Sequence, residues 1–166
     1  MVSRTPKTSP EQMISIVLYR PQMPANVGNI IRLCANFGMP LHILGPLDFF
    51  MDDRALVRAG LDYRETANMT QHTSFEAYME KIRPARLVAA TTGGTVRPDA
   101  FAFAGDDHVL FGRETSGLPE EVMSLVAQDC RLRIPMAGGS RCLNVCNSVA
   151  ILAYEAMRQS GFQGAG

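Results

Sequence analysis

Three short segments of this 166-residue chain bring polar side chains and glycines together where a strand is expected to end. The first is residues 24–32 (PANVGNIIR), in which Asn26, Gly28 and Asn29 stand at the start of a predicted helix and Arg32 follows one turn later. Free backbone N–H groups at a helix start bind anions or a ribose. Helix capping by Asn26, with Gly28 giving packing clearance, explains the same residues without a ligand.

The second segment is residues 111–119 (FGRETSGLP). Gly112 and Gly117 allow a positive φ or the close approach of a ligand. The Glu114 carboxylate stands where it can accept hydrogen bonds from a ribose or from exocyclic groups. A solvated turn that prepares the following helix is the alternative interpretation.

The third segment is residues 134–148 (IPMAGGSRCLNVCNS), a glycine pair and small polar residues that lead into the last predicted helix. Two amides, Asn144 and Asn147, and the Ser148 hydroxyl at one helix entrance exceed what capping requires. Capping still explains part of the pattern, with Asn147 as the N-cap and Ser148 behind it.

Several common chemistries lose support from what the sequence lacks. Neither GxGxxG after the first strand nor GxxxxGK[ST] is present, which disfavours hydride and phosphoryl transfer. The histidines at 42, 72 and 108 are too scattered to assemble a Ser–His–Asp or Cys–His arrangement. The cysteines at 34, 130, 142 and 146 form no CxxC pair, so neither a zinc site nor any other metal is expected.

Composition points to one globular domain with no overall basic bias. Apolar residues make up 46% and charged residues 19% of the chain, which excludes disorder and coiled coil. Because 16 Lys and Arg balance 16 Asp and Glu, any nucleic-acid contact must come from a local patch. Only Lys7 and Lys81 are lysines, and the remaining cations are arginines, which suit bidentate phosphate contacts. Genome composition explains this bias equally well.

The elements that must position these segments alternate between strand and helix. Short apolar runs predict buried strands at residues 14–19, 41–44, 86–91, 108–112 and 131–134. Periodicity and capping residues predict helices at 25–37 (closed by Gly38), 52–59 (ended by Gly60), 74–82 (begun by Ser74), 122–127 (entered through Pro119) and 147–159. This alternation predicts an α/β fold, a mainly parallel sheet with helices on both faces and ligands at the carboxyl ends of its strands.

The ends of the chain indicate where the protein works. Residues 1–12 are rich in Pro, Ser, Thr and Lys and lack the apolar core of a signal peptide. No apolar run approaches the roughly 20 residues of a membrane span. We therefore expect a short disordered tail, residues 1–12, before a cytoplasmic domain of residues 13–166 with no membrane contact.

Taken in order, the segments PANVGNIIRLCANFG, LFGRETSGLP and RIPMAGGSRCLNVCNSVAILAYEAMRQ closely resemble the small SPOUT-class RNA 2′-O-methyltransferases. The segment DDRALVRAGLDYRE is similar to the subfamily that methylates the wobble nucleotide, cytidine or uridine 34, of tRNA. The resemblance covers residues 14–159. It implies a C-terminal trefoil knot, one of the rare exceptions to unknotted topology. It also implies S-adenosylmethionine as cofactor, a homodimer and the tRNA anticodon loop as substrate.

The resemblance also implies roles for individual residues. Its cofactor contacts fall on Ala90, Gly112, Ile134 and Cys142. Its catalytic group falls on Asn26, Arg32, Glu114 and Asn144, with Ser140 as a further candidate. The family usually has Ser at 142 and often at 146, where this chain has Cys; a backbone contact would survive that change and a hydroxyl hydrogen bond would be weakened. No residue stands out as the general base, and the guanidinium of Arg32 suits positioning and charge stabilisation.

Two other functions remain open at this stage. The chain could be an RNA-binding member of the fold without catalysis, although the intact residues Asn26, Arg32, Glu114 and Asn144 argue against this. It could also methylate another tRNA or rRNA site. Relatives of that kind often carry an additional N-terminal RNA-binding domain, and the dozen extra residues here favour the minimal wobble enzyme.

Overall fold

A six-stranded parallel sheet forms the centre of the molecule, with strand order β3-β2-β1-β5-β4-β6. The computed structural model describes residues 13–166, and the predicted tail lies outside them. The strands are β1 (Ser15–Tyr19), β2 (Leu41–Leu44), β3 (Met69–His72), β4 (Arg86–Ala90), β5 (Asp107–Phe111) and β6 (Arg131–Leu132). The predicted α/β class with a parallel sheet is confirmed.

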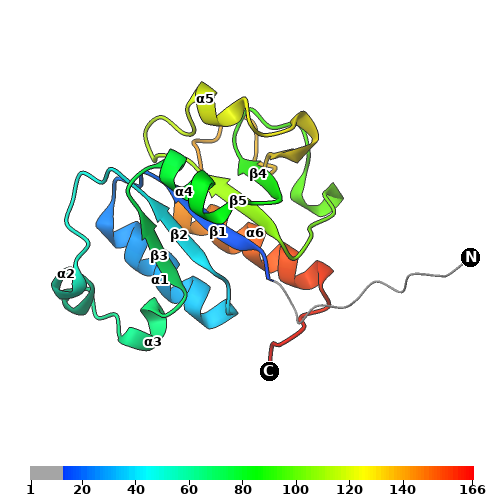
Figure 1. Ribbon diagram of the computed structural model, residues 1–166. Helices are drawn as coiled ribbons and strands as arrows, with labels where there is room; N and C mark the ends of the chain where they lie inside the picture. The colour runs from blue at the N-terminus through cyan, green and yellow to red at the C-terminus, as the bar shows by residue number, and fades with distance from the viewer. Residues whose placement is uncertain (1–12) are drawn as a thin grey trace, which may run out of the picture.

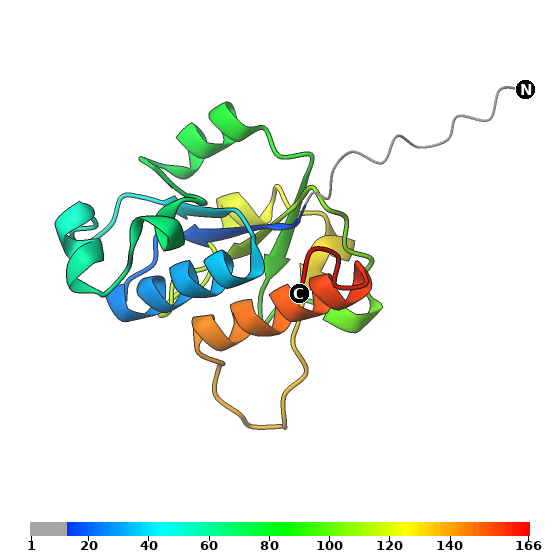
Figure 2. The same ribbon diagram turned by 90° about the horizontal axis from the view of Figure 1, so that it is seen from below.

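Helices cover both faces of this sheet, as predicted (Figures 1 and 2). The helices are α1 (Pro24–Phe37), α2 (Asp53–Arg58), α3 (Tyr63–Thr66), α4 (Phe75–Ile82), α5 (Glu120–Met123) and α6 (Val145–Gln159), with short 3-10 turns η1 (Pro98–Ala100) and η2 (Gln128–Cys130). Figure 2 shows α1 and α6 side by side on one face and α4 on the other. No helix in residues 13–166 combines the length and the apolar character needed to cross a bilayer.

The core explains why the strand predictions succeeded. Ile16 and Val17 are adjacent in β1, point to opposite faces and are both fully buried. Covering a parallel sheet on both faces produces the continuous apolar runs seen in the sequence. The predicted end of α1 is also confirmed, because Gly38 adopts φ 67° and closes the helix through its backbone N–H.

Two helix boundaries were predicted wrongly. The predicted helix over 122–127 is only the short α5, because the Arg131 guanidinium donates to the carbonyl oxygens of Met123 (2.6 Å) and Val126 (3.1 Å), which a continuing helix would use. The last helix begins at Val145, and Asn144 rather than Asn147 is its N-cap: the Asn144 side chain accepts from the Cys146 N–H at 2.8 Å. Both amides suit a cap, so residue type alone could not choose between them.

Two short elements, β3 and α3, were not predicted, and the predicted strand 131–134 shortens to β6. β3 (MTQH) is an edge strand with partly exposed side chains, so it lacks an apolar run. α3 does carry a sequence signal: Asp62 and Glu65 form a capping box, with Asp62 accepting from the Glu65 N–H and Glu65 accepting from the Asp62 N–H.

The three histidines, scattered in sequence, meet beneath α4. His42 Nδ1 and His72 Nε2 are 3.0 Å apart, and the Tyr78 hydroxyl lies 2.6 Å from His108 Nδ1. The rings of His42 and His108 stack with centroids 5.4 Å apart. Burial lowers the pKa of all three imidazoles, and that of His42 falls to about 4, with His108, His72 and Lys81 adding smaller electrostatic contributions. The cluster is therefore uncharged packing at neutral pH.

We expect acidification to destabilise the fold through this cluster. Above the ordinary histidine pKa of 6.5, His42 is neutral in both the folded and the unfolded chain. Below pH 6.5, His42 takes up a proton in the unfolded chain, whereas in the folded chain it stays neutral until about pH 4. The free energy of unfolding therefore falls as the pH drops from 6.5 to about 4. His42 alone lowers the free energy of unfolding by about 1 kcal/mol at pH 5.5. Denaturant melts at pH 7.5 and 5.5 should show a smaller pH difference for His42→Gln than for the wild type; an equal difference would contradict this assignment.

Candidate functional site

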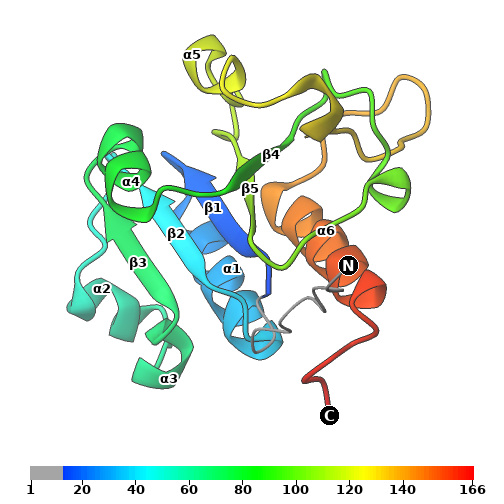
Figure 3. The same cartoon turned by 45° about the vertical axis from the view of Figure 1, so that its right-hand side comes forward.

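A cavity of about 630 Å³ opens at the carboxyl ends of β4, β5 and β6. Its walls come from these strand ends, from the turn after β5 and from the loop that precedes α6. In Figure 3 these connections lie together beyond the ends of β4 and β5. This is the edge of a parallel sheet where ligand sites form.

The four residues expected to contact a cofactor all line this cavity. Ala90 ends β4, Gly112 follows β5, Ile134 lies just beyond β6 and Cys142 lies on the loop before α6. The chain brings them together from positions up to 52 residues apart, because the three strands are neighbours in the sheet. Leu132, at the end of β6, adds an apolar wall that the sequence had not singled out.

Three of the expected catalytic side chains form one chain of hydrogen bonds at the rim of the cavity. Asn26 donates from Nδ2 to Glu114 Oε1 at 3.3 Å, and Asn144 donates from Nδ2 to Asn26 Oδ1 at 3.2 Å. Asn26 is only 6% exposed, so these partners satisfy a buried amide. All three residues line the cavity. The network thus joins the three segments singled out in the sequence.

Glu114 organises the start of α1. Its Oε2 accepts from the Gln22 N–H at 2.8 Å, and its Oε1 accepts from the Met23 N–H at 3.1 Å. A carboxylate at this end of a helix also interacts favourably with the helix dipole. Met23 is the N-cap of α1, and Asn26 lies inside the first turn, so the interpretation of Asn26 as the N-cap is wrong.

Cys146 belongs to the same network. Its Sγ lies 3.4 Å from the Asn26 carbonyl oxygen and 3.5 Å from Asn26 Oδ1. Burial raises the pKa of this thiol, so the sulfur keeps its proton and can donate. The thiol thus makes the kind of contact that a serine hydroxyl would make, as a weaker donor. Cys142, by contrast, is exposed on the loop.

Two glycines permit the close backbone approaches that shape the cavity. At Gly112, a Cβ would overlap the backbone of Gly117, which exchanges two backbone hydrogen bonds with Arg113 (3.1 and 2.9 Å). At Gly94, a Cβ would lie 2.6 Å from the Arg131 carbonyl oxygen, where the segment after β4 crosses β6. Gly94 could not be singled out from the sequence, because a contact between segments this far apart in the chain leaves no local pattern.

Arg32 does not join this network within the chain. It is not among the residues that line the cavity, and its Nε donates instead to Glu65 Oε1 of α3 at 2.9 Å. Its Nη2 also approaches the Gly60 carbonyl oxygen at 3.4 Å. Ser140 is exposed on the loop before α6 and does not line the cavity either. Within residues 13–166, no three His, Cys, Asp or Glu side chains gather into a group that could hold a metal ion.

Comparison with known proteins assigns the family. Residues 13–154 match the model of the SpoU rRNA Methylase family. A relative from Escherichia coli (strain K12), named tRNA (cytidine(34)-2′-O)-methyltransferase, is 46% identical over 92% of this chain and 98% of its own length.

Two solved structures share the fold. One, which gives structural insights into the 2-OH methylation of C/U34 on tRNA, has a TM-score of 0.81 and 40% identity, covering 92% of this chain and 99% of the other. The other is the SpoU methyltransferase AviRb from Streptomyces viridochromogenes in complex with the cofactor AdoMet, with a TM-score of 0.79, 27% identity, and coverage of 93% and 63%. With its predicted fold, its cavity at the sheet edge and these relatives, the chain belongs to the SpoU rRNA methylase family.

Proposed function

We propose that this protein transfers a methyl group from S-adenosylmethionine to the ribose 2′-oxygen of nucleotide 34 of tRNA. The carrying observation is the Glu114–Asn26–Asn144 hydrogen-bond chain at the rim of the cavity. The near full-length similarity to the Escherichia coli tRNA (cytidine(34)-2′-O)-methyltransferase supports this substrate over a ribosomal one. A cytoplasmic site of action belongs to the same proposal.

The cavity suits S-adenosylmethionine. Its volume of about 630 Å³ lies in the range of small-molecule sites, roughly 300–1,000 Å³. Leu118, Leu132 and Ile134 give apolar walls for an adenine ring, and Thr91 and Ser148 give hydroxyls for polar groups. The AdoMet-bound structure of the AviRb relative supports the same cofactor. The trefoil knot is part of this proposal, since residues 91–96 cross β6 within hydrogen-bond distance.

When bound, the cofactor supplies a methyl group on a positively charged sulfur that leaves as a neutral thioether. In the transfer, the 2′-oxygen would bond to the methyl carbon, the carbon–sulfur bond would break with its electron pair going to sulfur, and the hydroxyl proton would pass to the solvent. The protein must hold the hydroxyl in line with the methyl group and keep water out.

Glu114 and the two asparagines are the groups that orient the ribose. Each carboxylate oxygen has two lone pairs, so Glu114 Oε2, with one donor from Gln22, retains one for a ribose hydroxyl. Asn26 is fixed by Glu114 on one side and by Asn144 on the other, which prevents its amide from turning. Asn144 also caps α6, so it couples the rim of the cavity to the helix behind it.

A homodimer and binding of the anticodon loop complete the proposal. α6 exposes Ile151 (41%) and Tyr154 (56%), and Met23 at the start of α1 is 49% exposed. Ile151 and Tyr154 lie on α6 and Met23 directly precedes α1, the two helices that share one face of the sheet (Figure 2). A second copy would cover this apolar surface. Arg32, held on α3 in its own chain, then acts either after leaving Glu65 or in the cavity of that second copy.

The decisive experiment is methylation of tRNA with radiolabelled S-adenosylmethionine followed by nuclease mapping. We expect label on the ribose of nucleotide 34 and no requirement for added metal. Label on a base, or on a ribose outside the anticodon loop, would reject the substrate assignment. Cofactor binding without any methyl transfer to RNA would favour the non-catalytic alternative.

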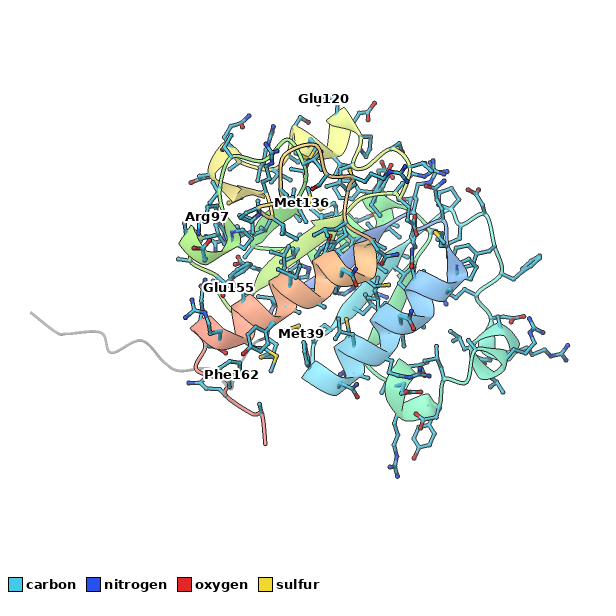
Figure 4. All side chains as sticks on the ribbon, turned by 180° about the vertical axis from the view of Figure 1, so that it is seen from behind. Met39, Arg97, Glu120, Met136, Glu155 and Phe162 are labelled. Atoms are coloured by element: carbon cyan, nitrogen blue, oxygen red, sulfur yellow. The ribbon has the colours of Figure 1, made fainter. Side chains whose placement is uncertain are left out.

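Glu114→Gln should reduce methyl transfer at least tenfold. The change keeps the shape but removes the charge and sets an amide N–H₂ against the donors of Gln22 and Met23. Loss of one transition-state contact of about 1.4 kcal/mol corresponds to a factor of ten. Glu120→Gln, an exposed glutamate at the start of α5 (Figure 4), is the matched control and should retain full activity. Equal rates for the two variants would remove Glu114 from the mechanism.

Arg32→Ala should also cost tenfold or more in methyl transfer while calorimetry shows nearly unchanged cofactor affinity, because Arg32 lies outside the cavity. Arg32→Lys keeps the charge but loses the planar fork, so a bidentate role predicts a large defect there too. Asn144→Ala, by contrast, should weaken both cofactor binding and transfer, since Asn144 lines the cavity.

Glu65→Gln is the control for the ion pair, because it releases Arg32 without removing the arginine. Activity close to wild type in Glu65→Gln but not in Arg32→Ala would place the effect in the guanidinium itself. Full activity in Arg32→Ala would exclude Arg32 from the reaction.

Tyr154→Asp should convert the dimer to a monomer, because it places a charge in the apolar surface of α6. Light scattering at micromolar concentration measures the change directly. Val57→Asp, a 70% exposed position on α2, is the control and should leave the dimer intact. A wild-type protein that is already monomeric would contradict the dimer proposal.

A further inference from the structure

Two arginines stand beside each other at the carboxyl ends of the two central strands. Arg20 directly follows β1, and Arg113 follows β5, its neighbour in the sheet. Both guanidinium groups lie against the loop after β2: Arg20 Nε donates to the Pro46 carbonyl oxygen at 3.3 Å, and Arg113 Nη2 to Asp48 Oδ2 at 3.4 Å. Arg113 also lines the large cavity. The pair therefore lies at the edge of the sheet where the cavity opens.

The hydrogen bonding of Arg113 is incomplete within the described chain. Its Nε is buried and meets no acceptor among residues 13–166. Its one ion pair, with Asp48, is long, and the Asp48 side chain is 70% exposed. A buried N–H without a partner destabilises the fold, and an exposed ion pair stabilises it only slightly. Stability of the fold thus gives no reason for an arginine here, whereas an incoming acceptor does.

The backbone conformation of Arg20 is a second, independent observation. It has φ 44°, in the left-handed region that residues other than glycine seldom adopt. The backbone is held there by a hydrogen bond from the Arg20 N–H to the Leu44 carbonyl oxygen at 2.9 Å. Strained conformations of this kind concentrate at ligand sites. Here the conformation turns the chain at the end of β1 and leaves the side chain on the Pro46–Asp48 loop beside Arg113.

We propose that Arg20 and Arg113 form a phosphate clamp for the RNA backbone that flanks the target nucleotide, an inference that rests on the proposed function. The planar guanidinium fork matches phosphate oxygens. The chain has no net charge, so its RNA affinity must come from local arginines of this kind. Asp48 is the counter-ion that a phosphate displaces from Arg113. The same fork would also fit the carboxylate of S-adenosylmethionine, and the experiment separates the two.

Binding of tRNA to Arg20→Gln and Arg113→Gln, measured by fluorescence anisotropy over a salt series, tests the clamp. Each variant should raise the Kd severalfold and lower the slope of log K against log salt by about 0.7–0.9, the value for one lost phosphate contact. The KM for tRNA should rise more than kcat falls. Arg97→Gln removes an arginine from an exposed pair with Asp99 on the side of the molecule opposite α2 and α3 (Figure 4), and it should match the wild type.

Asp48→Asn should change tRNA affinity in the opposite direction, and this distinguishes the clamp from an ion pair that only stabilises the loop. Freed from its counter-ion, Arg113 should bind tRNA more tightly than in the wild type. If the pair only held the loop, Asp48→Asn and Arg113→Gln would lower the Tm alike and neither would change the salt slope, which would overturn the proposal.

Two further outcomes would overturn the clamp. Wild-type Kd and slope in Arg113→Gln would exclude a phosphate contact. A raised Kd for S-adenosylmethionine with unchanged tRNA binding would assign the arginine to the cofactor carboxylate. If the wild-type protein neither binds nor methylates tRNA, the proposed function and the clamp are both rejected. If the wild type methylates nucleotide 34 and Arg113→Gln binds tRNA with an unchanged Kd and salt slope, only the clamp is rejected.

Discussion

The contact between the Glu114 carboxylate and the backbone N–H groups of Gln22 and Met23 is the one on which the site depends. It ties the turn after β5 to the start of α1, two segments more than 90 residues apart. The first N–H groups of a helix have no partner within the helix, so a carboxylate here stabilises the helix start as it fixes its own position. Asn26 and Asn144 are then placed by Glu114 in turn. Folding energy and the geometry of the site therefore come from the same bonds.

Close backbone packing supplies the second constraint. Gly112 and Gly94 allow two close backbone approaches that any side chain would prevent, the first within the turn at 112–117 and the second where the segment after β4 meets β6. These two approaches position the turn after β5 and the segment after β4, and both segments contribute residues to the cavity at the strand ends.

The sequence predicted the parts of the fold whose cause is local. Buried parallel strands appear in the sequence as apolar runs. A glycine such as Gly38, which adopts a left-handed conformation, marks the end of a helix in the sequence. The edge strand β3 could not be predicted, because half-exposed positions carry no pattern. The meeting of three histidines under Tyr78 could not be predicted either, since it depends on strand order rather than on spacing.

In the candidate site too, the sequence could place some residues, whereas the contacts of others depend on tertiary packing. The family resemblance selected Ala90, Gly112 and Ile134, and all three line the cavity. The strand pattern alone indicated only the edge of the sheet at which a ligand would bind, because the carboxyl ends of parallel strands meet there. Arg32 could be assigned to a helix face but not to a partner: a helical period gives direction around the axis, and the contact with Glu65 depends on where α3 packs.

The balance of formal charge hides an uneven use of the charged groups. Asp52 and Asp62 cap helices, and Asp107 is fully buried beside Arg86. These carboxylates accept from backbone N–H groups or from a guanidinium, so their field is partly compensated where they stand. Arg20 and Arg113, at the sheet edge beside the cavity, have weaker compensation. A chain with no net charge can therefore still carry locally uncompensated positive groups, and the clamp that we propose lies where the strands end and the cavity opens.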